Sequence, residues 1–329
     1  MFEIQLAPGP ADVVLVHPTS GEAAGRWRFG EGGALLTVDF LGDAWSMCRV
    51  DGRAADSAEL DDGFVAWPRM TFRVGGTATE LVSRDPEVLR RHYLRPAHQE
   101  TAYCGPPDPY VEAFHRARLA QLRRLLSGTT GRVLDAGSGY SLVAMAGPFP
   151  GLQIVACDRD PGAVRAINGD RRGLAVVGSA EQVPYRPGVF DAVFAGEIVE
   201  HLLRPDAALR GWVEALRPGG RLIVTTPNRT HVMARLLDRY EVKNPEHLFE
   251  YSPEELLAAV ERAGARVTHL EGLQLALPVY LPPRGWRDVL FGVRRRWGLP
   301  GPVVAASMRA GRWFPRHAEN LAVVAVRRP

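Results

Sequence analysis

The chain has 329 residues and a formal net charge of +3, so it can bury a full core and hold a second module beside one typical domain. The small net charge excludes a general need for a polyanionic partner, and no apolar run approaches the roughly 18 residues of a membrane-spanning helix. Three cysteines, Cys48, Cys104 and Cys157, form no CxxC pair, which argues against a disulfide framework and against a cysteine zinc site.

The chain opens without a signal-peptide pattern. Its positive charge is almost all arginine, because Lys243 is the only lysine. This bias, with abundant Ala, Gly and Pro, indicates GC-rich coding of the kind found in bacteria. We therefore expect a bacterial, cytoplasmic protein, and its oligomeric state stays open.

Residues 1–83 predict a small, mainly β module that is antiparallel. Short runs of strand-forming residues alternate there with glycine and aspartate clusters. The runs are residues 12–16, 34–40, 45–50, 70–74 and 77–82. No motif in this module points to a chemistry, so it can bind substrate, mediate dimerisation or brace the rest of the chain.

Residues 84–128 predict connecting helices. The first, over residues 85–94, begins with an Asp-Pro pair that suits a cap and a first helical position. The second, over residues 111–126, places apolar residues at helical spacing and arginines largely on the opposite side. From residue 129 onward, strand and helix patterns alternate, which is typical of a parallel, doubly wound α/β sheet.

The first strand of this sheet runs directly into a glycine turn at Gly137 and Gly139. These glycines allow backbone N–H groups to approach a ligand at the start of a helix. A dinucleotide-binding loop would have Gly or Ala five residues after Gly137, where this chain has Leu142. Asp135 would repel a pyrophosphate but suits a ligand that carries an ammonium and a sulfonium. The loop therefore predicts a site for S-adenosylmethionine.

Further cofactor candidates follow the next three strands. Asp158 lies about 20 residues past the glycines, where a carboxylate can accept both ribose hydroxyls. The remaining candidates are Ser179, Ala180 and Glu181 after the third strand, and Ala195 and Glu197 at the end of the fourth. Ligands of open α/β sheets bind at the carboxyl ends of strands, where all of these residues fall.

The glycine loop, Asp158, residues 190–197 and residues 216–228 together resemble the class I S-adenosylmethionine-dependent methyltransferases. The resemblance covers roughly residues 129–270 and implies a Rossmann-like methyltransferase domain over residues 129–329. Members of the family often have an aspartate where this chain has Ser179. Backbone groups of Ala180 and Glu181 would therefore carry more of the adenine recognition.

Glu197, Glu200 and His201 follow the fourth strand at i, i+3 and i+4, so on a helix they share one face. Two carboxylates and an imidazole form half of a divalent-metal site, and His247, in a later loop, could complete it. Alternatively, no metal binds, because an EHL-like helix start also occurs in methyltransferases whose histidine only orients loops. His201 or His247 would then be a candidate general base.

Two subfamilies bear on this choice. Residues 197–202, residues 225–229 and His247 look like the magnesium-assisted O-methyltransferases of ubiquinone biosynthesis, which act on catechol-type rings. They are also similar to small-RNA terminal ribose methyltransferases, where two glutamates and two histidines bind the metal beside a vicinal diol. The resemblance implies Mg or Mn at Glu197, Glu200, His201 and His247, with the two histidines as catalytic residues.

The leading hypothesis is an O-methyltransferase that acts on a hydroxyl of a sugar, glycoside or other polyhydroxylated small molecule. One alternative is RNA ribose 2'-O-methylation, which the ten arginines of residues 284–329 favour and the genomic arginine bias weakens. A predicted basic helix near Trp286 and Trp297 can also be a solvated face or contact phosphate or an anionic membrane. The third hypothesis is a catalytically inactive S-adenosylmethionine-binding protein.

Residues 271–318 predict a long lid-like excursion from the sheet.

Overall fold

A computed structural model describes residues 109–169, 173–236, 247–275 and 301–329, together with eight strands closer to the N-terminus. The chain divides into two compact units. One comprises residues 1–103 and 243–248, and the other comprises residues 104–242 and 249–329.

The described strands of the first unit form two sheets, of order β1-β4-β5 and β6-β3-β2-β7-β8. The strands are β1 (Phe2–Gln5), β2 (Ala11–Val16), β3 (Ala23–Phe29), β4 (Leu35–Leu41), β5 (Ala44–Val50), β6 (Ser57–Leu60), β7 (Arg69–Val74) and β8 (Thr77–Val82). Every pairing is antiparallel, which confirms the predicted β module. Strands β1, β3 and β6 were not predicted. In β3, the exposed Arg26 and Arg28 flank Trp27, so the run has little of the apolar character that marks a strand in sequence.

The second unit contains a seven-stranded sheet of order β11-β10-β9-β12-β13-β15-β14. Its strands are β9 (Gly131–Ala136), β10 (Leu152–Asp158), β11 (Leu174–Val177), β12 (Phe190–Gly196), β13 (Leu216–Pro227), β14 (Ala265–Leu273) and β15 (Asn320–Arg327). Strands β9 to β13 pair in parallel, and β15 runs antiparallel to both of its neighbours. The strand order reverses between β9 and β12, and ligands of doubly wound sheets bind at such a reversal. The predicted Rossmann-like fold is confirmed.

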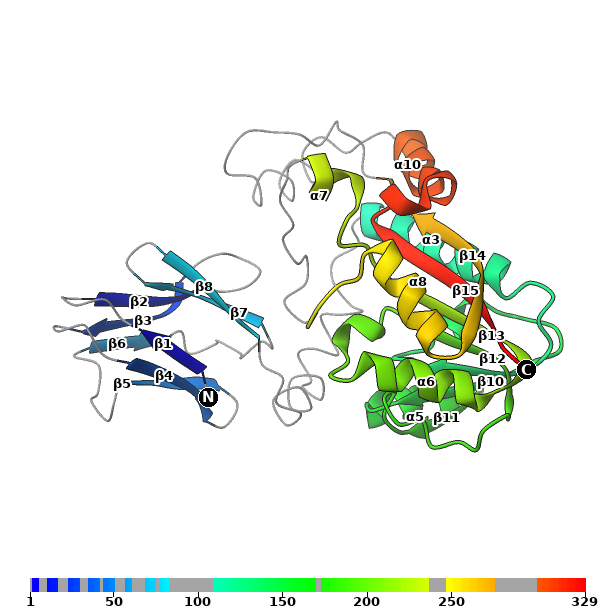
Figure 1. Ribbon diagram of the computed structural model, residues 1–329, viewed down its shortest axis with the longest axis horizontal. Helices are drawn as coiled ribbons and strands as arrows, with labels where there is room; N and C mark the ends of the chain where they lie inside the picture. Colours follow the sequence, from blue (N-terminus) through cyan, green and yellow to red (C-terminus); the bar gives the residue numbers. More distant parts are fainter. Residues whose placement is uncertain are drawn as a thin grey trace. The chain divides into compact units, whose positions relative to one another are not determined.

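Helices cover both faces of this sheet (Figure 1). The helical segments are α3 (Pro109–Leu125), α4 (Leu142–Ala146), α5 (Pro161–Gly169), η1 (Val199–His201), α6 (Pro205–Ala215), α7 (Val232–Leu236), α8 (Pro253–Arg262), α10 (Gly301–Trp313) and η3 (Pro315–His317). Successive residues of a strand point to opposite faces, so Val193 packs in the core with α6 and α8 whereas Phe194 packs in the core with α3 and α4.

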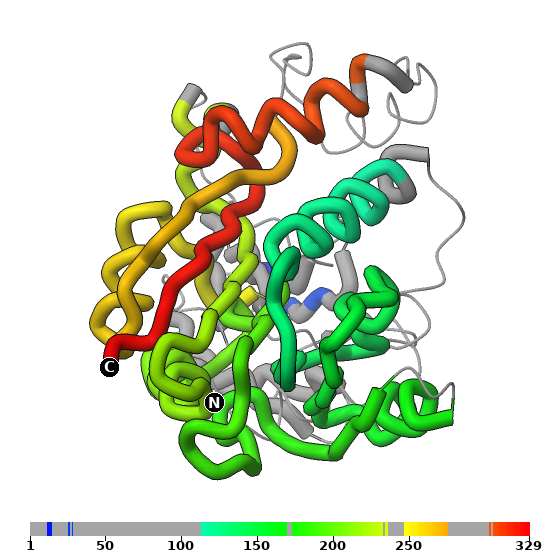
Figure 2. The backbone as a smooth tube through the Cα atoms, turned by 90° about the vertical axis from the view of Figure 1, so that its right-hand side faces the viewer, coloured from blue at the N-terminus to red at the C-terminus, as the bar shows by residue number. Residues whose placement is uncertain are grey.

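The chain ends at the antiparallel edge of the sheet, where β14 and β15 run side by side and α10 lies over β14 (Figure 2). Strand β14 extends to Leu273, so it includes the first three residues of the predicted excursion. Of the predicted excursion over residues 271–318, the structure describes residues 271–275 and 301–318. The helices predicted over residues 85–94 and around Trp286 to Trp297 lie outside the described residues. In the described part of the chain, no helix is both long enough and apolar enough to cross a membrane.

Candidate cofactor and metal site

The glycine loop connects β9 to α4 at the carboxyl end of the sheet. Gly137 and Gly139 have positive φ angles of 66° and 49°, a region that favours glycine. A Cβ atom at Gly137 would lie 2.4 Å from the Ile198 side chain, so the position also excludes larger residues by contact. Ser141 ends the loop, and its hydroxyl accepts a hydrogen bond from the Ala144 amide as the cap of α4.

Asp158 is the last residue of β10 and holds this loop in place. Its Oδ2 accepts a hydrogen bond from the Gly139 amide at 2.7 Å, and its Oδ1 accepts one from the Asp160 amide at 2.8 Å. Burial raises the pKa of this carboxyl group. A carboxylate has about four lone-pair positions, so each oxygen can still accept a ribose hydroxyl.

Asp135 lies beneath the loop and is only 2% exposed. Its Oδ2 accepts a hydrogen bond from the Ser141 hydroxyl at 2.7 Å. Burial raises the pKa of Asp135 to about 7, and the nearby charge of Asp158 adds to this effect. Asp135 therefore supports the loop from below, and a cation bound above the loop would favour its ionised form.

The polar groups of the segment after β11 already form hydrogen bonds within the protein. The Ser179 hydroxyl accepts hydrogen bonds from Arg159 and from the Glu181 amide. The Ala180 carbonyl accepts one from the Trp212 indole at 2.8 Å. The Glu181 carboxylate accepts bonds from the backbone amides at residues 203 and 204, so it ties this segment to the turn after β12.

The turn after β12 differs from the predicted helical face. Glu197 has a positive φ of 53°, and its amide donates to the Thr225 carbonyl at 2.8 Å. This conformation stops the chain from entering a helix at Glu197, and only the 3-10 turn η1 follows. The prediction of one α-helical face was therefore wrong. The Glu197 carboxylate instead accepts a hydrogen bond from the Asn320 amide at 3.1 Å.

Glu200 is fully buried at the centre of this turn. Its Oε2 accepts a hydrogen bond from the Thr226 hydroxyl at 2.9 Å, and its Oε1 lies 3.9 Å from the His201 Nε2. Burial raises the pKa of Glu200 well above its usual value, and the charge of Glu197 raises it further. A positive charge placed beside Glu200 would oppose both effects.

Glu200, His201 and His247 each offer one ligand atom, and these atoms lie within 4.8 Å of one another. His247 is 7% exposed. One carboxylate and two imidazoles form a mixed oxygen and nitrogen donor set that suits a divalent transition metal. The residues present therefore fit a metal ion. The cluster does not include Glu197, which the sequence had also suggested as a ligand.

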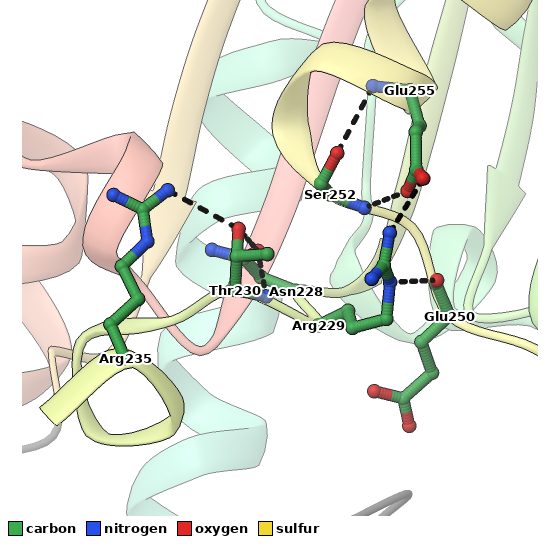
Figure 3. A network of polar contacts seen from close by, with 7 residues as sticks. All are labelled: Asn228, Arg229, Thr230, Arg235, Glu250, Ser252 and Glu255. Carbon is green, nitrogen blue, oxygen red and sulfur yellow. Dashed lines mark hydrogen bonds and ion pairs between the residues drawn. The ribbon is translucent and has the colours of Figure 1, made fainter. Parts of the chain in front are cut away.

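The segment after His247 is fixed to the loop after β13, as Figure 3 shows. Arg229 donates through Nε to the Glu250 carbonyl at 3.2 Å and through its guanidinium to Glu255 at 2.5 Å. Glu255 in turn forms a capping box with Ser252 at the start of α8. The helix start therefore anchors the backbone three residues after His247.

Comparison with known proteins identifies the family of the chain. A family described as "Methyltransferase domain" matches residues 134–224. The Ubiquinone biosynthesis O-methyltransferase of Xanthomonas euvesicatoria pv. vesicatoria (strain 85-10) is 31% identical over 188 residues, which cover 51% of this chain and 76% of that protein. The chain belongs to the S-adenosylmethionine-dependent methyltransferases. The protein of the same name from Xylella fastidiosa (strain M23) is 30% identical over 189 residues, 52% of this methyltransferase and 74% of its relative.

A solved S-adenosylmethionine-dependent methyltransferase from Archaeoglobus fulgidus is similar in fold to this methyltransferase. It is 18% identical, with a TM-score of 0.47, and the match covers 66% of this chain and 98% of that one.

The sequence did not indicate two polar residues of the candidate site. Thr226 donates to Glu200, and Asn320 donates to Glu197. The Thr-Thr pair that ends β13 was part of the family resemblance, so it could have suggested Thr226. Asn320 lies more than a hundred residues from Glu197 in sequence, and only the pairing of β13 with β15 brings its strand to the site.

Proposed function

We propose that this methyltransferase transfers the methyl group of S-adenosylmethionine to a hydroxyl oxygen of a sugar, glycoside or other polyhydroxylated small molecule, with a magnesium or manganese ion at the site. The observation that carries the proposal is the cluster of Glu200, His201 and His247. Support for an oxygen acceptor comes from the relatives, which are named O-methyltransferases.

The cofactor would lie over the carboxyl ends of β9, β10 and β12. In this proposal, Asp158 accepts the ribose hydroxyls, and the loop amides around Gly137 and Gly139 approach the methionine part. Ala195 and Ser179 to Glu181 border the adenosine. Asp135 supports the loop from below and supplies negative charge toward the sulfonium and ammonium groups.

The acceptor hydroxyl would lie beside the cluster, where Glu200, His201 and His247 would hold the divalent cation. When bound, such an ion lowers the pKa of a coordinated hydroxyl. The C–S bond of the cofactor breaks as the C–O bond of the product forms, and S-adenosylhomocysteine leaves. The hydroxyl proton must pass to a base. Glu197 lies outside the cluster and is oriented by Asn320, so it is our candidate for that base.

The direct test is methyl transfer from labelled S-adenosylmethionine to a panel of polyhydroxylated compounds and fractionated cell extract, with and without EDTA. We expect a labelled O-methyl product whose formation stops with EDTA and returns with magnesium or manganese. Label on nitrogen or carbon would contradict the oxygen acceptor. Full activity after exhaustive chelation would contradict the metal.

A further inference from the structure

A narrow pocket lies between α3 and the carboxyl ends of β12 and β13. Its polar wall is formed by Arg118, Gln121, Glu197, Thr225 and Asn320, and apolar residues such as Phe114 form the rest. Glu197 therefore borders both this pocket and the turn that carries Glu200. The side chains of Gln121 and Thr225 have no role in the proposed binding of the cofactor or the metal.

Two polar atoms of the pocket wall have no hydrogen-bond partner in the described part of the chain. They are the amide nitrogen of Gln121 and the hydroxyl oxygen of Thr225. Both residues are more than nine-tenths buried, with 4% of Gln121 and 8% of Thr225 exposed. Buried polar groups are almost always paired in folded proteins, so these two atoms point to a ligand.

The chemistry of the wall selects the ligand group. An amide N–H donates only, and a threonine hydroxyl both donates and accepts. An ammonium ion cannot accept from Gln121. The wall holds both the Arg118 guanidinium and the Glu197 carboxylate, so it has no net charge that would select a carboxylate or a phosphate. A neutral hydroxyl accepts from the Gln121 amide and also donates to an oxygen of Thr225 or Glu197. The pocket therefore fits an uncharged hydroxyl.

The pocket and the metal cluster lie on opposite faces of the sheet at the end of β13. Thr225 and Thr226 are successive residues of β13, so their side chains point to opposite faces of the sheet. Thr226 donates to Glu200 of the metal cluster, whereas Thr225 faces the pocket beside α3. An acceptor that reaches both groups must extend across the end of β13 and carry hydroxyls at both positions.

We propose that Gln121 and Thr225 bind a hydroxyl of the acceptor other than the one that is methylated, and so select polyhydroxylated acceptors over simple diols. This inference rests on the proposed function, because it assumes that the reacting hydroxyl lies beside the Glu200 cluster.

The test measures binding of three uncharged ring compounds, cyclohexanol, cis-1,2-cyclohexanediol and myo-inositol, to the full chain with S-adenosylhomocysteine and manganese present. Wild type should bind inositol more tightly than the diol. Gln121→Leu and Thr225→Val should each weaken inositol binding about 10-fold, the loss of one buried hydrogen bond. Diol binding should change less than about twofold.

Matched control variants are Gln153→Leu and Thr268→Val, which alter exposed residues of β10 and β14. Both should bind all three compounds as wild type does. Thermal unfolding of each variant checks the fold. Gln121→Leu should not lower the unfolding temperature, because it removes a buried donor that has no partner among the described residues.

Three results would overturn the inference: no preference of wild type for inositol over the diol, unchanged inositol binding in both pocket variants, or equal losses for diol and inositol. Different results would show that the proposed function itself is wrong. If the protein bound no manganese, the proposed metal site would be contradicted. Label on nitrogen or carbon would contradict the proposed oxygen acceptor. Either result would leave the discrimination between inositol and diol as a separate measurement.

Discussion

The glycine loop and the metal cluster are built in different ways. In the loop, Asp135 bonds to Ser141 six residues away, and Asp158 bonds to Gly139 across the adjacent strands β9 and β10. In the cluster, Glu200 bonds to Thr226 of another strand and lies beside His247 of a later segment. The loop thus needs only two adjacent strands, whereas the cluster also needs His247 from a segment beyond β13.

This difference has an energetic consequence. Backbone N–H groups share the charge of Asp158, so the loop is largely preorganised without its ligand. Burial raises the pKa of both carboxyl groups, but at Glu200 the charge of Glu197 raises it further. Glu200 is therefore less readily ionised until a cation lies beside it. Substitutions in the cluster should therefore reduce turnover, and substitutions in the loop should reduce cofactor affinity.

The largest expected effect is on turnover in the cluster. His201→Ala and His247→Ala should each lower kcat at least about 100-fold, because loss of a metal ligand removes several kcal/mol of transition-state stabilisation. Affinity for S-adenosylhomocysteine, measured by calorimetry, should stay within a few-fold of wild type. His317→Ala, at an exposed histidine of η3, is the control and should leave kcat unchanged. A matching loss of cofactor affinity would remove the distinction between the two regions.

In the loop, Asp158→Ala should weaken S-adenosylmethionine binding by roughly 30- to 1000-fold. Loss of two hydrogen bonds to a charged acceptor costs about 2 to 4 kcal/mol. Calorimetry with the cofactor measures this directly. Unchanged affinity would show that the ribose does not bind at the end of β10, and tight NAD binding in its place would overturn the ligand assignment.

The same distinction explains what the sequence could predict. The order of strands, the glycine loop and Asp158 follow from local patterns, because an apolar run and a glycine turn have the same geometry in many folds. The sequence could not predict that Glu197 adopts a positive φ, because that conformation depends on its bond to the Thr225 carbonyl of β13. Asn320 and Gln121 also lack any local signal, since only strand pairing and helix packing bring them to the site.

A smaller effect is expected on stability at Asp135. Its pKa rises from 3.8 in the unfolded chain to about 7 in the folded protein. The folded state therefore holds the proton more tightly, and this group lowers the free energy of unfolding as pH rises from about 4 to about 7.

Asp135→Asn removes this pH dependence and should raise the free energy of unfolding above pH 7 by roughly 1 to 3 kcal/mol. The gain should shrink toward pH 4, and the variant should bind S-adenosylmethionine more weakly. Urea unfolding at several pH values measures the first effect. A variant less stable than wild type at pH 8 would contradict the account of Asp135.

The smallest effect is expected at the basic C-terminal segment. Arg309 is exposed on α10 and has no place in the cofactor loop or the cluster, so Arg309→Glu should change kcat and the acceptor KM less than about threefold. A gel shift with short RNA at several salt concentrations is the companion measurement. Salt-sensitive RNA binding that this variant weakens would favour RNA as the acceptor.

The most direct test of the central claim is manganese binding, followed by electron paramagnetic resonance of the free ion. Wild type should bind one Mn²⁺ ion, and Mn²⁺ should restore methyl transfer to the chelated protein. Glu200→Gln and His247→Ala should weaken Mn²⁺ binding at least about 10-fold, while His317→Ala should bind as wild type does. Wild-type Mn²⁺ affinity in both cluster variants, or full methyl transfer with no metal bound, would contradict the claim that Glu200, His201 and His247 hold a catalytic cation.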